Sequence, residues 1–317
     1  MTRQASPSAE SDVKAMSETV TSPAGPETGA GQAEPTPLGI IAGAGAFPLA
    51  LAKAATAQGR AIHGLLLKGI AGQDLTVYPH SWVGIGQFGA ILKAARRAGC
   101  RDLVFIGSLV RPNLWTTMPD LVALKHIPEM ARLYRGGDDH LLRGVARLFE
   151  RQGFRLLAAQ DVAPELLMPV GPLSRRVPDH EDLVDIAQAL AAMRALGPYD
   201  VGQGMVIGAK RIVAVEGAEG TDGMLERCAA MRVSGRLKWG KAIGTLVKAP
   251  KPHQDRRIDL PAIGPATVEK AAAAGLRGIA VIAGSTLMVE PQEIIRLADQ
   301  HGLFVVGVDP AGEANHD

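Results

Sequence analysis

Short apolar runs alternate with stretches of helical periodicity along most of this chain. The first run, residues 38–42, ends in a glycine turn that is followed by a helical pattern at residues 48–58 and a second apolar run at residues 62–67. Strands connected by crossover helices produce this alternation, because each helix returns the chain to the start of the next parallel strand. The sequence therefore predicts an α/β fold.

The same alternation continues towards the C-terminus, with one interruption. Further strands are expected at residues 83–85, 102–106, 204–207, 211–215, 242–248, 278–282 and 303–308, and further helices at residues 88–98, 183–196, 223–231, 267–274 and 291–301. The interruption is a loop rich in proline and glycine at residues 169–172, which is typical of a domain boundary. We therefore expect a Rossmann-like N-terminal domain over residues 38–167 and a distinct α/β C-terminal domain over residues 168–312.

Composition excludes several classes of protein. Residues 1–37 contain almost no large apolar side chains, so burial cannot offset the entropy of ordering them, and a disordered extension is expected. The net charge of the 317 residues is only +2, without a block of like charge or an aromatic array, which argues against nucleic acid as a ligand. No apolar run reaches the roughly 18 residues of a membrane helix. Because Cys100 and Cys228 show no metal-binding or redox spacing, we expect a cytoplasmic protein with two buried thiols.

A glycine turn lies between the first predicted strand and the first predicted helix. Gly43 and Gly45 would let the backbone approach an anion, which the free N–H groups at the helix N-terminus would bind. Lys68 ends the second predicted strand, where an NAD-binding domain carries an acidic residue for the ribose diol. Pro48 also replaces the third glycine of the dinucleotide fingerprint. The turn therefore predicts binding of phosphate or a nucleotide other than NAD, with a merely structural turn as the alternative.

Two acidic groups lie at the expected beginnings of helices. Asp138 and Asp139 start a helical run, where carboxylates either cap the helix or hold a cation or a sugar hydroxyl. Glu219, Thr221 and Asp222 lie between a predicted strand and a predicted helix, where loops of α/β sheets carry function. Asp222 or Thr221 could cap that helix, whereas Glu219 gains nothing from such a role.

The densest charged segment spans residues 248–261. It contains four basic residues, the carboxylates of Asp255 and Asp259, and three prolines that stiffen it. This mixture suits pyrophosphate hydrolysis, because cations neutralise the phosphates while carboxylates hold a metal ion and orient a water molecule. Hard oxygen ligands favour Mg²⁺, or Mn²⁺, over zinc. A solvated loop of surface ion pairs is the alternative interpretation.

Several motifs occur in a fixed order. They are Leu38-Gly39-Ile40-Ile41-Ala42-Gly43, Gly137-Asp138-Asp139, Gly202-Gln203, Glu219-Gly220-Thr221-Asp222, Lys251-Pro252 with Gln254-Asp255, Arg257, Asp259, Pro261 and Ile263-Gly264, then Ala274-Gly275-Leu276, Gly278-Ile279-Ala280-Val281, Ala298-Asp299 and Gly302-Leu303-Phe304. Together they resemble the LpxI-type UDP-2,3-diacylglucosamine pyrophosphatases. The resemblance runs from Leu38 to about Val308.

The resemblance implies a hydrolase of lipid A biosynthesis that acts on a UDP-sugar. Such an enzyme would convert UDP-2,3-diacylglucosamine to 2,3-diacylglucosamine 1-phosphate (lipid X) and UMP with Mg²⁺, water attacking the glucosamine-side phosphorus. A homodimer is expected, with the ligand held between the two domains and peripheral contact with the inner membrane as a further expectation. Two other classes stay open, a non-catalytic nucleotide-sugar or lipid-binding protein and an NAD-dependent oxidoreductase.

The resemblance also ranks the candidate residues. It implies that the C-terminal domain is catalytic, with Asp255 as the most critical carboxylate and Asp222 and Asp259 completing the catalytic metal site. The implied substrate-binding residues are Gly43, Gly45, Lys68, Asp138, Asp139, Gln203, Glu219, Thr221, Lys251, Gln254 and Arg257, of which Lys251 and Arg257 would clamp the phosphates. One departure is visible, because Ile282 stands where the family is expected to carry an acidic residue.

Overall fold

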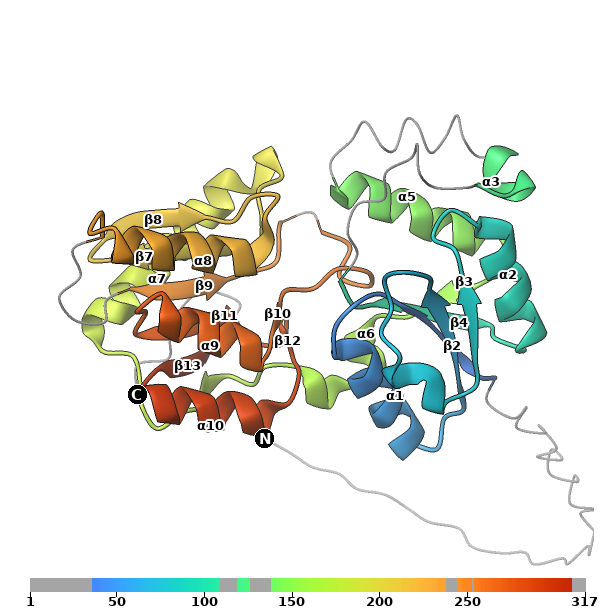
Figure 1. Ribbon diagram of the computed structural model, residues 1–317, viewed down its shortest axis with the longest axis horizontal. Helices are drawn as coiled ribbons and strands as arrows, with labels where there is room; N and C mark the ends of the chain where they lie inside the picture. Colours follow the sequence, from blue (N-terminus) through green and yellow to red (C-terminus); the bar gives the residue numbers. More distant parts are fainter. Residues whose placement is uncertain (1–35, 109–118, 126–137, 238–243, 253, 310–317) are drawn as a thin grey trace, which may run out of the picture. The chain divides into compact units, whose positions relative to one another are not determined.

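Among the residues that the structure describes, two large sheets each have helices on both faces (Figure 1). The computed structural model describes residues 36–108, 119–125, 138–237, 244–252 and 254–309. All of these residues belong to one compact unit. The expected disordered extension at residues 1–37 lies almost entirely outside the described residues. The α/β class that the sequence predicts is confirmed.

The first sheet has five strands, all parallel, in the order β3-β2-β1-β4-β5. The strands are β1 Leu38–Ala42, β2 Ile62–Leu67, β3 His80–Val83, β4 Asp102–Ile106 and β5 Arg155–Leu156. This order begins at the centre of the sheet and runs outward on both sides, as in doubly wound α/β domains. The carboxyl ends of β1, β2 and β4 therefore lie at one edge.

Helices cover both faces of this sheet, which explains the unbroken apolar runs of its central strands. Helix α1 Phe47–Ala57 packs on one face, while α2 Phe88–Arg97 and α5 Asp138–Arg151 pack on the other. Successive residues of β1 alternate between the two cores, since Ile40 lies in the α1 core and Ile41 in the α2 core. The short helices α3 Leu121–Lys125 and α6 Ala159–Val162 complete this part of the chain.

The prediction of a strand at residues 83–85 is wrong in its position. Strand β3 spans His80–Val83, and the chain turns directly afterwards, where the N–H of Gln87 donates to the carbonyl of Gly84. The strand lies at the edge of the sheet, and its first three residues, His80, Ser81 and Trp82, are only half-buried. Such a strand contains no apolar run, so the pattern of apolar residues predicts only its buried last residue, Val83, correctly.

The second sheet has six strands in the order β6-β13-β11-β9-β7-β8. They are β6 Gly171–Pro172, β7 Gly204–Gly208, β8 Arg211–Val215, β9 Thr245–Lys248, β11 Gly278–Ile282 and β13 Phe304–Val308. The three central strands β9, β11 and β13 are parallel, whereas β6, β7 and β8 each run antiparallel to a neighbour. A short ladder of β10 Ala262–Ile263 with β12 Leu287–Met288 is separate.

This second sheet is also covered on both faces. Helix α7 His180–Leu196 packs on one face, and α8 Gly220–Val233, α9 Pro265–Ala273 and α10 Pro291–His301 pack on the other. Both cysteines are buried, as expected, with Cys228 inside the core beneath α8. None of the helices within the described ranges is long and apolar enough to span a bilayer.

Candidate active site

Polar side chains gather at one edge of the second sheet, where β9 ends at Lys248. Strand β7 runs antiparallel to β9 and pairs Gly204 with Lys248, so β7 begins where β9 ends. Strand β8 runs antiparallel to β7 and therefore ends at the same edge, beside the start of β7. Three segments that are separated in the sequence thus meet at this edge.

Lys248 is the centre of this polar edge. The residue is only 6% exposed, and its Nζ donates hydrogen bonds to Thr221 Oγ1 and to the carbonyl oxygen of Ala262, each at 2.9 Å. The Thr221 hydroxyl in turn donates to Glu216 Oε2 at 2.8 Å. Burial holds the pKa of Lys248 below its usual range, while the nearby carboxylates of Glu216, Asp222 and Asp259 act in the opposite direction.

Glu216 lies directly over the backbone that leads into β7. A Cβ atom added at Gly202 would lie 2.4 Å from Glu216 Cγ, and one added at Gly204 would lie 2.4 Å from Glu216 Oε2. The two glycines therefore make room for this carboxylate. Between them, Gln203 Nε2 donates a hydrogen bond of 2.8 Å to Asp259 Oδ2, which connects the start of β7 to the charged segment of residues 248–261.

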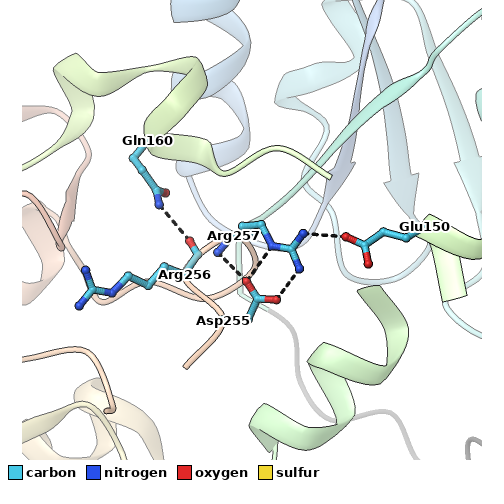
Figure 2. A network of polar contacts seen from close by, with 5 residues as sticks. All are labelled: Glu150, Gln160, Asp255, Arg256 and Arg257. Carbon is cyan, nitrogen blue, oxygen red and sulfur yellow. Dashed lines mark hydrogen bonds and ion pairs between the residues drawn. The ribbon is translucent and has the colours of Figure 1, made fainter. Parts of the chain in front are cut away.

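Asp255 is held by Arg257 in the same segment (Figure 2). Its Oδ1 accepts hydrogen bonds from the Arg257 backbone N–H at 3.1 Å and from Nε at 3.0 Å, and its Oδ2 accepts from Nη2 at 2.8 Å. The Arg257 side chain holds the pKa of Asp255 below its ordinary value, and burial opposes this only in part. Asp255 is therefore an anion at neutral pH.

Arg257 also connects this segment to the first sheet's helices. Its Nη1 donates to Glu150 Oε1 of α5 at 2.6 Å, and the Gln160 amide of α6 donates to the carbonyl oxygen of Arg256 at 3.2 Å. Figure 2 shows Arg257 between the carboxylates of Asp255 and Glu150. The guanidinium predicted to clamp phosphate thus binds two carboxylates in this structure.

The other predicted residues of this segment are also engaged in polar contacts. Lys251 Nζ forms an ion pair of 2.6 Å with Asp200, and the Lys251 backbone N–H donates to Gln254 Oε1 at 2.9 Å. The Gln254 Nε2 atom is buried without a hydrogen-bond partner among the described residues, which leaves a donor to offer to a ligand. His253 lies outside the described residues.

The three residues of the Glu219-Thr221-Asp222 motif contact different partners in the structure. Only Thr221 takes part in the polar edge through hydrogen bonds, to Lys248 and Glu216. Glu219 precedes α8 and forms a 2.6 Å ion pair with Arg227, and Asp222 forms one of 2.9 Å with Lys270 while its side chain stays 57% exposed. Neither Thr221 nor Asp222 caps α8, because the N-cap position is Glu219 and it makes no side-chain cap hydrogen bond.

The glycine turn lies at the carboxyl end of β1, at the start of α1. Gly43 is needed for close packing, since an added Cβ would lie 2.5 Å from the carbonyl oxygen of Ser108, and its N–H already donates to the Ile106 carbonyl. Gly45 has a φ of 93° and open space around it. The first turn of α1 has no side-chain cap, so its N–H groups are not occupied by a side chain.

A shallow pocket adjoins this turn. Gly43, Gly45, Leu49, Gly72 and Asp74 are among the residues that line it. Lys68 is exposed at the end of β2 and is not among the residues that line this pocket, so its role in binding phosphate stays a prediction. Asp74, on the short 3₁₀ helix after β2, is an acidic residue in the lining of this pocket that the sequence does not single out.

Asp138 and Asp139 are the first two residues of α5. Their position at a helix N-terminus agrees with the expected helical run. Their side chains lie outside the described residues, so both interpretations of this pair, helix cap and ligand for a cation or hydroxyl, stay predictions.

Asp255 and Asp259 are the two carboxylates of the charged segment that are predicted to hold Mg²⁺. The N–H of Asp259 donates to the carbonyl of Asp255 at 3.2 Å, so the two residues belong to one turn of the backbone. Mg²⁺ is usually bound by one or two carboxylates together with water and substrate phosphates. Within the described ranges no three His, Cys, Asp or Glu side chains come together as ligands, so Asp222 does not complete a ready-made group of three.

Ile282, the residue at the position of an expected acid, ends β11. It is buried in the apolar core beneath α7, with Ile186, Met205 and Val247. A carboxylate at this position would be surrounded by apolar side chains, and isoleucine is the residue that this packing favours.

Besides Asp74 in the pocket, three residues of the site are not singled out by the sequence: Lys248, Glu216 and Glu150. Lys248 belongs to the charged segment, where the sequence predicts no separate role for it, and the sequence predicts none for Glu216 or Glu150. The signal for Lys248 was present, because it is a lysine that ends a buried apolar strand, where a charge requires partners. Glu216 and Glu150 carry no such signal, since single glutamates near the ends of strands and helices are ordinary surface residues.

Comparison with known proteins covers nearly all of the described residues. The model of the LpxI N-terminal domain matches residues 37–166, and that of the LpxI C-terminal domain matches residues 169–306. The chain is 45% identical over 273 residues to the UDP-2,3-diacylglucosamine pyrophosphatase LpxI of Caulobacter vibrioides, a match that spans 86% of this chain and 98% of that relative.

Proposed function

The chain belongs to the LpxI family, and we propose from this that it is an enzyme that hydrolyses UDP-2,3-diacylglucosamine to 2,3-diacylglucosamine 1-phosphate and UMP in lipid A biosynthesis. The observation that carries this conclusion is the match over almost the whole length of the Caulobacter pyrophosphatase. The match to the LpxI C-terminal domain includes residues 248–261, the segment whose charges suit pyrophosphate chemistry. The reaction adds water to one phosphorus and breaks the bond from that phosphorus to the bridging oxygen.

The charged segment supplies the groups that this hydrolysis requires. Asp255 stays ionised because Arg257 lowers its pKa, so it can accept a hydrogen bond from the attacking water and orient it. Lys251 and Arg257 of this segment form ion pairs with carboxylates, and they are the cations that would bind the phosphate oxygens of the pyrophosphate. Cations placed there stabilise the negative charge that develops on the phosphoryl oxygens.

Mg²⁺ is the metal that the carboxylates fit best, with Mn²⁺ as a substitute. Asp255 and Asp259 would hold it from one turn of the backbone, and the substrate phosphates would supply further oxygen ligands. When bound, the ion neutralises phosphate charge. Gln203 supports this role, because its amide holds one oxygen of Asp259 and thereby orients the other.

The Rossmann-like N-terminal part of the chain receives the UDP moiety. Gly45 and the uncapped first turn of α1 provide a backbone that an anionic group can approach. The adjoining pocket, with Asp74 in its lining, offers a carboxylate to sugar or base N–H and O–H groups. This assignment is supported by the strand order and by the position of the turn at the carboxyl end of β1.

The surroundings of the enzyme follow from its substrate. A diacylated UDP-sugar resides at a membrane surface, so we expect a cytoplasmic protein with peripheral contact to the inner membrane. Helix α3 supports such contact, since Leu121 and Leu124 are 79% and 46% exposed and Lys125 follows them. We also expect a homodimer, which light scattering of the purified protein would test.

Release of UMP is the decisive assay. Purified protein is incubated with UDP-2,3-diacylglucosamine and Mg²⁺, and UMP is quantified; a UDP-sugar without acyl chains serves as the control substrate. EDTA should abolish the release, and added Mg²⁺ or Mn²⁺ should restore it. Binding of the acylated substrate without any UMP would instead identify a non-catalytic binding protein.

A further inference from the structure

Lys248 is a charged residue in a position where a charge is costly. It ends β9, it is 6% exposed, and its neighbours along the strand belong to the apolar cores on both faces of the sheet. Replacement of buried ionic groups by apolar ones of similar volume is often neutral or stabilising. Stability alone therefore does not explain an ammonium group at this position, and its contacts must be considered.

The contacts of Lys248 connect the two motifs that carry the candidate chemistry. Its Nζ donates to Thr221, in the first turn of α8, and to the carbonyl of Ala262, three residues after Asp259. The ammonium thus joins the end of β9 to both segments at once. Through the Thr221 hydroxyl it also orients Glu216.

The electrostatic contacts of Lys248 also connect it to the candidate active site. Glu216, Asp222 and Asp259 all interact electrostatically with its ammonium group. Of these three, Glu216 shares the partner Thr221 with Lys248 and Asp259 is held by Gln203 at the same edge, whereas Asp222 is ion-paired with Lys270. Burial lowers the pKa of Lys248, and the carboxylates raise it.

We propose that Lys248 is a positioning residue of the pyrophosphatase reaction, which holds the Thr221 turn and the segment carrying Asp255 and Asp259 in register. This inference rests on the proposed function, since it concerns the same site. The residue does not contact the reacting atoms; it acts through the hydrogen bonds to Thr221 and Ala262. Displacement of catalytic groups by about 1 Å is enough to reduce turnover about 100-fold.

The test compares Lys248→Met with Thr245→Val. Met keeps most of the side-chain volume without the charge, whereas Thr245 lies on the same strand, fully buried, with a hydroxyl that has no hydrogen-bond partner among the described residues. We expect kcat of Lys248→Met to fall about 30- to 100-fold with KM changed less than about threefold. Thr245→Val should keep kcat within about twofold, as expected for a substitution that removes no interaction.

Two results would overturn the inference. One is a folded Lys248→Met enzyme whose kcat lies within about threefold of the wild type. The other is a loss of activity that only follows the unfolded fraction measured by circular dichroism at the assay temperature, which would mean a purely structural role. A wild-type enzyme that releases no UMP refutes the proposed function instead, so the two failures are distinguishable.

A second pair of variants covers the case in which Lys248→Met does not fold. Thr221→Val removes the hydroxyl that accepts from Lys248, at a half-buried position where the apolar isostere fits. We expect kcat to fall about tenfold or more, and Thr221→Ser, which restores the hydroxyl, to recover most of that loss. Equal losses in both Thr221 variants, or no loss in Thr221→Val, would contradict the role assigned to this hydrogen bond.

Discussion

Replacement of Asp255 by asparagine separates the charge of this residue from its shape. Asparagine has nearly the same volume and can still accept a hydrogen bond from Arg257 through its amide oxygen. The substitution removes the negative charge, which the Arg257 guanidinium otherwise maintains by lowering the pKa of Asp255. Arg257 keeps its ion pair with Glu150 in the variant. The predicted result is a folded protein that binds substrate and turns it over very slowly.

The magnitudes distinguish a catalytic defect from a folding defect. Asp255 is 16% and Arg257 is 40% exposed in the ion pair that they form, so solvent screens it and its loss costs about 1–2 kcal/mol of stability. A protein with about 5 kcal/mol of stability or more would then stay over 99% folded. Loss of a group that orients the attacking water lowers kcat by about 10²- to 10⁴-fold, which is about 3–5 kcal/mol of barrier.

The assay is release of UMP from UDP-2,3-diacylglucosamine at saturating Mg²⁺, with kcat and KM determined separately. Arg257→Gln serves as the matched variant, because it removes the other half of the same ion pair. We expect Asp255→Asn to lower kcat with little change in KM, and Arg257→Gln mainly to raise KM through weaker phosphate binding. If Asp255→Asn keeps kcat within about threefold, or if both variants show the same defect, Asp255 only anchors Arg257 and the reasoning fails.

Two predictions concern the first sheet and are checked by urea unfolding. Gly43→Ala should destabilise the protein by about 1–3 kcal/mol, because the new Cβ would lie 2.5 Å from the backbone oxygen of Ser108 and neither group can yield; an unchanged midpoint would contradict this. Asp102→Asn should cost about 2 kcal/mol at pH 7, since buried Asp102 binds Arg155 at 2.7 Å and also Arg60. The hydrogen bond from Arg155 lowers the pKa of Asp102, so its stabilisation is present above the unfolded-state pKa of about 3.9 and is lost as the pH falls through the folded value. The two proteins should therefore differ less at about pH 3 than at pH 7, and an equal difference at both would refute the charge argument.

Elements that depend on local pattern were predicted closely from the sequence. The predicted bounds are correct for strands β1, β2, β4 and β11 and for helix α10. The apolar run or helical periodicity that predicts each of them lies within its own consecutive residues. The position predicted for the edge strand β3 was wrong because most of its residues are only half-buried and form no apolar run. The two-residue strands β5, β6, β10 and β12 were not predicted at all. Such strands form only because a neighbouring strand supplies their hydrogen bonds, which no short sequence window contains.

The sequence by itself determined the α/β class and the family, and it predicts the segment of residues 248–261 as the centre of the chemistry. The fold class rests on the local pattern of apolar residues along the chain, and the family rests on the resemblance of its ordered motifs. Only the tertiary structure decided which polar residues meet. The antiparallel strands β7 and β8 bring Gln203 and Glu216 to the edge where β9 ends in Lys248, and α5 brings Glu150 to Arg257. Asp222 directly follows Thr221 in the chain but forms its ion pair with Lys270, because a helix turns successive side chains about 100° apart and only some of them can face one site.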